Sequence, residues 1–207
     1  MIATKVGPSR EPSGEWREPA SPAELRGLVE ENLRQLGRDH LDLVYLRVVS
    51  RGSLADRFAV LAELREQGLI RQLGISAVGA EQLAEARAIA PVIAVQNSYG
   101  LGYRAKQDEL IRLCGELGVA YVPFFSIATA SREAGGGSAE PEELVAVAAA
   151  QGVTTAQVRL AWTLQRGPHV LVIPGTGDPK HLAENVAAGD LRLSSAELAA
   201  LDALHSA

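Results

Sequence analysis

The sequence predicts an α/β fold in which about six parallel strands alternate with helices, as in a partial (β/α)8 barrel. Three observations support this prediction. Strand-like and helix-like segments follow one another in a regular rhythm along the 207 residues. The strand-like segments are continuous apolar runs, which is typical of parallel strands buried on both faces. Polar side chains gather where these strands end, and barrel proteins build their active sites at that position.

The first elements can be read from local signals. Residues 2–6 form a short β-type run, and residues 8–20, rich in Pro, Gly and charge, are expected to form a loop. A helix should begin at Ser21-Pro22-Ala23-Glu24, because Ser is a favoured N-cap, Pro suits the first helical position and an acidic residue suits the first turn. Apolar residues then recur at helical spacing until Gly37 ends the segment.

The remaining elements alternate in the same way. Further strands are expected at residues 41–49, 70–76, 92–97, 120–127 and 170–173. Further helices are expected at residues 54–66, 80–89, 105–117, 142–150, 155–165, 179–188 and 195–204. The low-complexity stretch at residues 134–139 predicts a loop.

Alternating strands and helices also fit an open, doubly wound sheet, so two architectures remain possible. No Gly-x-Gly-x-x-Gly follows the first strand and no Gly-Lys-Ser/Thr phosphate loop occurs, which disfavours a Rossmann or nucleotide-hydrolase fold. The polar residues at the carboxyl ends of the predicted strands are Lys5, Arg47, Ser76, Gln96, Asn97, Ser126 and Thr176.

Composition narrows the class of protein. A hydrophobic share of 47% fits a single domain over residues 1–207. The net charge of −5 argues against nucleic acid and anionic membranes as partners. The single Cys114 excludes an internal disulfide framework and a multi-Cys zinc site, and the histidines show no ligand spacing, so no metal is implied. A reducing cytoplasm is the expected location.

Several segments, in order along the chain, resemble the aldo-keto reductase family. The segments that resemble its third to seventh barrel strands are residues 2–5, 41–46, 68–76, 95–97 and 121–125. Residues 173–176 and 181–185 resemble the end of the fold that clamps the cofactor. The resemblance implies a truncated, TIM-barrel-like fold that lacks the first two strand–helix units, and NAD(P)H-dependent reduction of a carbonyl group.

The resemblance also implies which catalytic groups are present. The family uses a Tyr as proton donor, a Lys that lowers its pKa, an Asp paired with that Lys, and a His that orients the carbonyl. Lys5 matches the Lys and Arg47 stands at the His position, whereas the Asp and Tyr belong to the first two units. A reductase of this kind would therefore need another proton donor, and Tyr45 or a water bound to Arg47 are the candidates.

The cofactor residues are better matched. By resemblance, the nicotinamide would contact Ser76, Gln96 and Phe125, the pyrophosphate and ribose would contact Ser126, Gly175 and Thr176, and the adenine would contact Glu184 and Asn185. Ala77 stands where the family has an Asn that also contacts the carboxamide. Gly175 and His181 stand where the family often has a Lys and an Arg for a 2′-phosphate, so NADP and NAD both remain possible.

The residues themselves also allow purely structural interpretations. Lys5 could be only a charge near an open barrel mouth, and Phe125 could as easily belong to the core. Tyr45 and Arg47 share strand parity and should face the same side. If that side is the interior, Arg47 is a buried cation that needs a carboxylate or a ligand anion, and it could clamp a substrate carboxylate or stabilise an oxyanion.

A partial barrel would leave the two outermost strands of its sheet with open edges. These edges are expected to be covered, because open edges promote aggregation. A homo-oligomer, a sheet that curls shut, or coverage by the loops 8–20 and 128–141 would each do so; the chain could also be a fragment of a longer gene product.

Two classes of function remain. One is a reductase acting on a small-molecule substrate. The other is a non-redox cyclase, lyase or isomerase, or an inactive binding protein, on the same fold.

Overall fold

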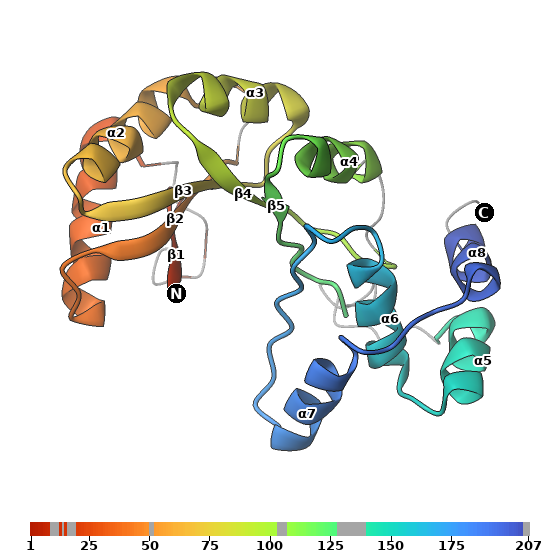
Figure 1. Ribbon diagram of the computed structural model, residues 1–207. Helices are drawn as coiled ribbons and strands as arrows, with labels where there is room; N and C mark the ends of the chain where they lie inside the picture. The colour runs from red at the N-terminus through yellow and green to blue at the C-terminus, as the bar shows by residue number, and fades with distance from the viewer. Residues whose placement is uncertain are drawn as a thin grey trace. The chain divides into compact units, whose positions relative to one another are not determined.

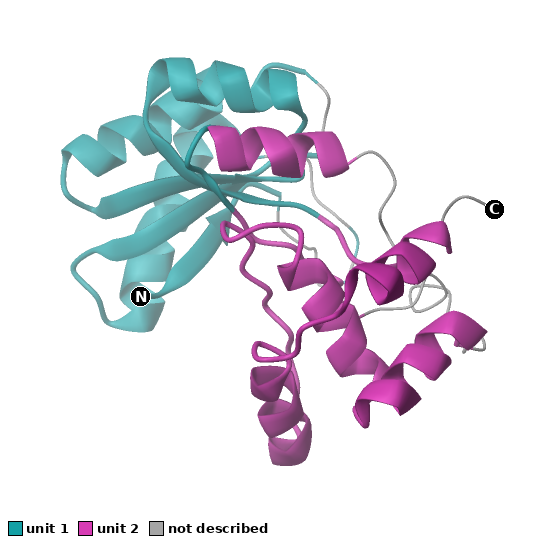
Figure 2. Ribbon diagram, turned by 45° about the vertical axis from the view of Figure 1, so that its right-hand side comes forward, with its two compact units in different colours: residues 1–97, 117–120 teal, residues 98–116, 121–207 magenta. Residues whose placement is uncertain are grey.

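The computed structural model describes residues 1–8, 13, 15, 20–49, 52–102, 107–127 and 140–204. The chain divides into two compact units (Figure 2). The first unit comprises Met1–Asn97 and Leu117–Ala120, and the second comprises Ser98–Glu116 and Tyr121–Ala207. A single domain over residues 1–207 stays a prediction, and most of the two loops expected at residues 8–20 and 128–141 lies outside the described residues.

Strands and helices alternate along most of the chain (Figure 1). The strands are β1 (Ala3–Val6), β2 (Leu41–Arg47), β3 (Ile70–Ser76), β4 (Val92–Gln96) and β5 (Ala120–Tyr121). The helices are α1 (Pro22–Leu36), α2 (Ala55–Glu66), α3 (Ala80–Ile89), α4 (Asp108–Glu116), α5 (Glu142–Gln151), α6 (Thr155–Leu164), α7 (Pro179–Ala187) and α8 (Ser195–Ala203). This parallel α/β alternation confirms the predicted fold class.

The first unit is built on a sheet of strand order β1-β2-β3-β4-β5, in which β5 begins with Ala120 of this unit. The pairs β1–β2, β2–β3 and β3–β4 are parallel. Helices α1, α2 and α3 follow one another along one face of this sheet (Figure 1). The strand side chains on that face are buried and apolar, among them Val44, Leu46, Ile75 and Val95. The other face carries the polar strand ends, because successive side chains alternate between faces.

The sixth predicted strand, at residues 170–173, is wrong. Among the described residues this segment forms only an isolated parallel bridge between Tyr121 and Val170. The predicted strand at 120–127 is likewise reduced to β5 and a second isolated bridge between Ser98 and Phe124. Pro123 has no backbone N–H with which to continue the ladder after Tyr121, which accounts for the short β5.

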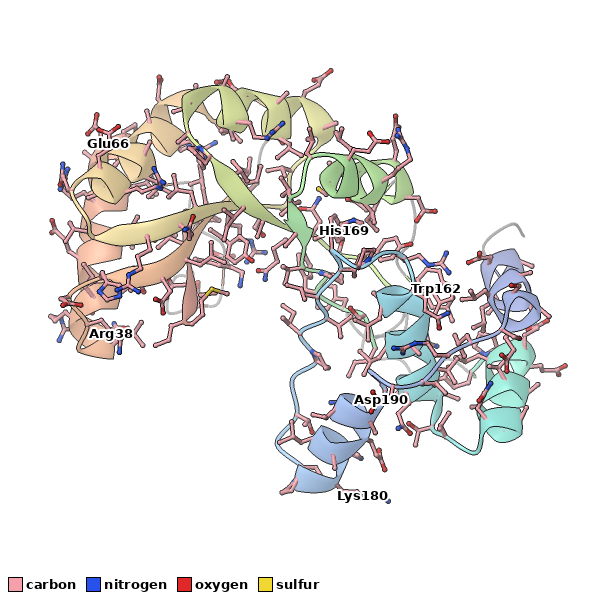
Figure 3. The ribbon with its side chains drawn as sticks, viewed as in Figure 1. Arg38, Glu66, Trp162, His169, Lys180 and Asp190 are labelled. Atoms are coloured by element: carbon pink, nitrogen blue, oxygen red, sulfur yellow. The ribbon has the colours of Figure 1, made fainter. Side chains whose placement is uncertain are left out.

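The second unit is held by an aromatic core. Trp162 of α6 is fully buried and stacks on Tyr99 with ring centroids 5.5 Å apart, and Tyr121 meets Tyr99 edge-on at 6.2 Å. Trp162 is labelled on α6 in Figure 3. Its indole N–H donates to the Asp202 carboxylate of α8 at 2.9 Å. Arg166 covers the indole with its guanidinium carbon 4.3 Å from the ring centroid. These contacts join α6 and α8 to the segments that carry the tyrosines.

Helix ends follow the signals in the sequence. Ser21 caps α1 by accepting the Glu24 N–H at 3.3 Å, within a capping box, and Gly37 ends the helix in a left-handed conformation with φ of 61°. Two further capping boxes begin α6 and α8. Each capping side chain satisfies a backbone N–H that has no partner within the helix.

Among the described helices, none is by itself long and apolar enough to cross a membrane. Helices α5 and α6 together meet the length and composition, but the pair bends by 92° at its break.

Candidate functional site

Four parallel strands of the first unit bring polar side chains to the carboxyl edge of its sheet. Lys5 is the next-to-last residue of β1, and it pairs in register with Tyr45 of β2. Arg47 ends β2 and pairs with Ser76 of β3, which in turn pairs with Gln96 of β4. Residues 45 and 47 lie on the same face because strand side chains alternate. The structure therefore brings together these five residues that the sequence predicted.

Tyr45 has a fixed place because of a glycine on the neighbouring strand. A Cβ on Gly74 would lie 2.5 Å from Tyr45 Cδ1 and 2.6 Å from Cε1, so the phenol ring occupies the space above this glycine. Lys5 Nζ lies 5.9 Å from the centroid of the same ring, within reach of a cation–π interaction. Tyr45 is 2% exposed, and this burial raises the pKa of its hydroxyl to about 12. Tyr45 therefore keeps its proton at neutral pH.

The pKa of Lys5 is shifted in the opposite direction. Partial burial lowers the pKa of its ammonium below the usual value, and the positive charge of Arg47 lowers this pKa further. No salt bridge to Lys5 exists within the described part of the chain. An ammonium with a lowered pKa gives up its proton more readily than a free lysine does.

Ser76 and Gln96 form the buried part of this edge. Ser76 is 1% exposed and Gln96 is 4% exposed. The Gln96 side-chain oxygen Oε1 is buried and has no hydrogen-bond partner among the described residues. A buried acceptor without a partner is costly, and such an atom calls for an explanation, of which a bound ligand is one.

Asn97 shapes the loop that follows Ser76, a role that the sequence did not reveal. Its Oδ1 accepts the Val78 N–H at 3.1 Å, and its Nδ2 donates to the Val78 carbonyl at 2.7 Å. The Ala77 N–H donates to the Gln96 carbonyl at 3.1 Å. Ala77 has a φ of 61°, a left-handed conformation that favours Gly or Asn. The only signal in the sequence was a polar pair, residues 96 and 97, after an apolar strand.

The second unit holds the other residues predicted for the cofactor. Phe125 is 39% exposed, has a φ of 67°, and meets Phe124 edge-on at 5.0 Å. Ser126 is buried, and its hydroxyl donates to the Pro123 carbonyl at 3.3 Å. A Cβ on Gly100 would lie 2.9 Å from Ser126 Cα, so these two segments approach closely.

The remaining residues predicted for the cofactor lie in the loop before α7 and in α7 itself. Gly175 and Thr176 are exposed, and Thr176 Oγ1 accepts the Asp178 N–H at 3.1 Å. Asp178 caps α7, whose residues Glu184 and Asn185 are half-buried. Glu184 lies 3.8 Å from the Lys180 ammonium; Lys180 is labelled in Figure 3. The ligand contacts expected of these residues stay predictions.

Other kinds of site are not supported. Within the described residues, no group of three or more His, Cys, Asp or Glu side chains could hold a metal ion. Cys114 is buried, and burial raises the pKa of its thiol to about 11, so it is a poor nucleophile.

Comparison with known proteins gives a consistent result. The model of the aldo/keto reductase family matches residues 1–206. The chain is 43% identical to pyridoxine 4-dehydrogenase of Escherichia coli (strain K12), over 98% of this chain and 71% of that protein. It is 36% identical to an uncharacterized oxidoreductase of Schizosaccharomyces pombe, over 98% of this chain and 64% of that protein. The chain thus spans roughly two thirds of the length of these relatives.

Solved structures agree. A thermostable aldo-keto reductase in complex with the inhibitor epalrestat superposes with a TM-score of 0.80 at 29% identity, over 98% of this chain and 70% of that chain. An aldo/keto reductase from Klebsiella pneumoniae in complex with NADP and acetate superposes with a TM-score of 0.78 at 30% identity, over 88% and 65%.

The contact between Tyr45 and Gly74 yields a prediction. Gly74→Ala should lower the free energy of unfolding by about 1–3 kcal/mol, because the new methyl group displaces the phenol ring. Denaturant unfolding measures this change. In a Tyr45→Ala background the same substitution should cost less, since the ring is gone. An equal cost in both backgrounds would show that the ring is not the cause.

The two hydrogen bonds between the Asn97 side chain and the Val78 backbone yield a second prediction. Asn97→Ala should lower the free energy of unfolding by about 1–3 kcal/mol for each Val78 group left without a partner. Gln96→Leu is the matched control, and it should be neutral or stabilising because it removes an oxygen that already has no partner. Thermal and denaturant unfolding compare the two variants. Equal destabilisation by both would contradict the assignment of Asn97 as the residue that holds this loop.

Proposed function

The chain belongs to the aldo/keto reductase family, and from that premise we propose that it reduces the carbonyl group of a small molecule with a nicotinamide dinucleotide. The observation that carries the proposal is the row Arg47–Ser76–Gln96 at the carboxyl edge of the first unit's sheet, with Lys5 on the adjoining strand.

The residues of this row fit the cofactor. Gln96 Oε1 is a buried acceptor that lacks a partner among the described residues, and the amide N–H of a nicotinamide carboxamide would satisfy it. Ser76, its neighbour in register, is buried beside it and offers a hydroxyl that can donate or accept. The contacts that the family resemblance assigns to Phe125, Ser126, Gly175, Thr176, Glu184 and Asn185 stay predictions.

Lys5 supplies the proton in this proposal. When bound, the reduced nicotinamide supplies a hydride to the carbonyl carbon. The carbonyl oxygen is then left as an alkoxide, and it takes a proton from the Lys5 ammonium to give the alcohol. Lys5 is solvent-accessible and can recover a proton from water. The lowered pKa of Lys5 makes its ammonium a stronger acid than that of a free lysine.

Tyr45 and Arg47 assist in other ways. The raised pKa of Tyr45, about 12, makes its hydroxyl a weaker acid than that of a free tyrosine. Its ring instead supports the Lys5 ammonium. Arg47 offers the N–H donors of a guanidinium, which can bind an oxygen.

Cofactor binding is the first test. We expect saturable quenching or enhancement of NADPH or NADH fluorescence, measured with both cofactors because the sequence favours neither. Gln96→Leu should weaken binding by about 3- to 10-fold, the range of one hydrogen bond. Gln72→Leu, on the same strand as Ser76 but away from the carboxyl edge, is the control and should bind as the wild type does. No binding of either cofactor at millimolar concentration would eliminate a reductase and favour the non-redox alternative.

The pH dependence of turnover tests the role of Lys5. Reduction needs the protonated ammonium, so kcat/KM should fall as pH rises through the pKa of Lys5, below the usual 10.5. Oxidation of the alcohol needs the neutral amine and should rise through the same pKa. Lys5→Met should abolish this limb in both directions and reduce the rate by about 10²- to 10⁴-fold, the usual contribution of general acid catalysis. A variant that keeps the wild-type profile would exclude Lys5 as the donor.

A further inference from the structure

We propose that Val49, which lies just past the end of β2, contacts an apolar substituent of the carbonyl substrate, and that Glu85 of α3 holds the chain around Val49 in place for this contact. This inference deepens the proposed function and rests on it. It names a substrate class, carbonyl compounds with an apolar substituent. It also makes Glu85 a positioning residue, which acts through the chain and not on the substrate.

The hydrogen bonds of Glu85 are the first support. Helix α2 begins after Leu54, whose own side chain makes no capping hydrogen bond. Glu85 accepts the Leu54 N–H through Oε2 at 2.9 Å and the Ser53 hydroxyl through Oε1. The Ser53 hydroxyl oxygen accepts the Ala55 N–H at 3.2 Å. A carboxylate from α3 therefore satisfies backbone groups at the start of α2 that would otherwise lack a partner.

The same two hydrogen bonds keep Glu85 ionised. Accepting the Leu54 N–H and the Ser53 hydroxyl lowers the pKa of the Glu85 carboxyl below its ordinary value. An ionised carboxylate offers only acceptors, and hydrogen bonds to a charged group are stronger than those between neutral groups. Glu85 therefore holds Ser53 and Leu54 with both of its oxygens at neutral pH.

Gln82 extends this hold by one residue. It lies three positions before Glu85 on α3, and residues at this spacing share a face of the helix. Its side-chain nitrogen donates to the Gly52 carbonyl at 2.9 Å, and its side-chain oxygen accepts the Gly79 N–H at 3.2 Å. Two side chains of α3 thus fix three consecutive residues of the chain between β2 and α2, residues 52–54.

The other end of this connection is fixed at the candidate site. The Val48 N–H donates to the Ser76 carbonyl at 2.9 Å, and the Val48 side chain is fully buried. Val49 follows directly. Val49 and Gly52 are three residues apart in the chain, so their Cα atoms can be separated by at most about 10–11 Å. Holding Gly52 therefore restricts where Val49 can lie.

Val49 is an apolar side chain at the carboxyl edge of the sheet. It is exposed, whereas Val48 and Leu54 of the same connection are buried. It follows the strand end that pairs with Ser76, and Lys5 lies on the adjoining strand. Ligands of α/β barrels contact the loops that follow the strands, so a substrate with its carbonyl at Lys5 would extend toward this connection. Burying Val49 against an apolar substituent would then favour binding.

A matched pair of aldehydes tests the role of Val49. We would measure KM for benzaldehyde and for acetaldehyde at saturating cofactor, because the two differ in the apolar group beside the carbonyl. The wild type should have the lower KM for benzaldehyde. Val49→Ala should raise that KM by about 4- to 15-fold, the value of one or two buried methyl groups, and should leave the KM for acetaldehyde unchanged.

Variants of Glu85 test the positioning. Glu85→Ala should raise the KM for benzaldehyde by about 3- to 10-fold with kcat unchanged, as when a third to a tenth of the molecules keep Val49 in place. Glu85→Gln keeps one acceptor oxygen, so its effect should be smaller. In a Val49→Ala background Glu85→Ala should have less effect, because the contact that it positions is gone. Glu81→Ala is the control, since Glu81 is an exposed glutamate on the same helix, and its KM should match the wild type.

Hydrogen exchange measures the hold without cofactor or substrate. The Leu54 amide should exchange at least about 10-fold faster in Glu85→Ala than in the wild type, the range of one hydrogen bond to a charged group. Glu81→Ala should exchange as the wild type does. Circular dichroism confirms that each variant is folded, and the nearly isosteric Glu85→Gln replaces Glu85→Ala in all comparisons if the latter is not.

The outcomes separate this inference from the proposed function. If cofactor binds and carbonyl compounds are reduced, but KM is no lower for benzaldehyde than for acetaldehyde, the inference is overturned while the proposed function stands. The same holds if Glu85→Ala leaves KM or the exchange of Leu54 unchanged, or raises KM equally with and without Val49. If the wild type binds neither cofactor or reduces no carbonyl compound, the proposed function fails and this inference fails with it.

Discussion

The hydrogen-bond ladder that aligns β2, β3 and β4 is the constraint on which the candidate site depends. It sets Arg47, Ser76 and Gln96 in one row at the carboxyl edge. Because side chains alternate along a strand, a slip of one residue would send a whole strand's polar set to the helix-covered face. The apolar side chains buried under α1 to α3 resist that slip, since it would expose them. Packing on one face of the sheet therefore fixes the chemistry on the other.

The same row holds arrangements that stability alone would not select. Gln96 Oε1 is buried without a partner among the described residues, and Ala77 occupies a left-handed conformation that is unfavourable for alanine. Asn97 offsets part of this cost by bonding both backbone groups of Val78. Local features that disagree with the rest of a well-packed sheet are expected where a protein binds or transforms a ligand. They coincide here with the residues that the family resemblance assigns to the nicotinamide.

What the sequence could predict was set by how local each signal is. Strands β1 to β4 and the Ser21 cap depend on nearby residues, and the structure has them where the sequence placed them. The strand expected at residues 170–173 depends on a partner strand, and only the bridge to Tyr121 is present among the described residues. Two contacts join residues that are 19 or more positions apart: the hydrogen bonding of Asn97 with Val78, and the packing of the Tyr45 ring against Gly74. No local sequence pattern predicts such contacts.

Burial acts on Lys5 and Tyr45 in opposite senses, and this decides which of them suits proton donation. Removing water disfavours the charged form of each group, so the tyrosine holds its proton more tightly and the lysine less tightly. Arg47 weakens the hold of Lys5 further.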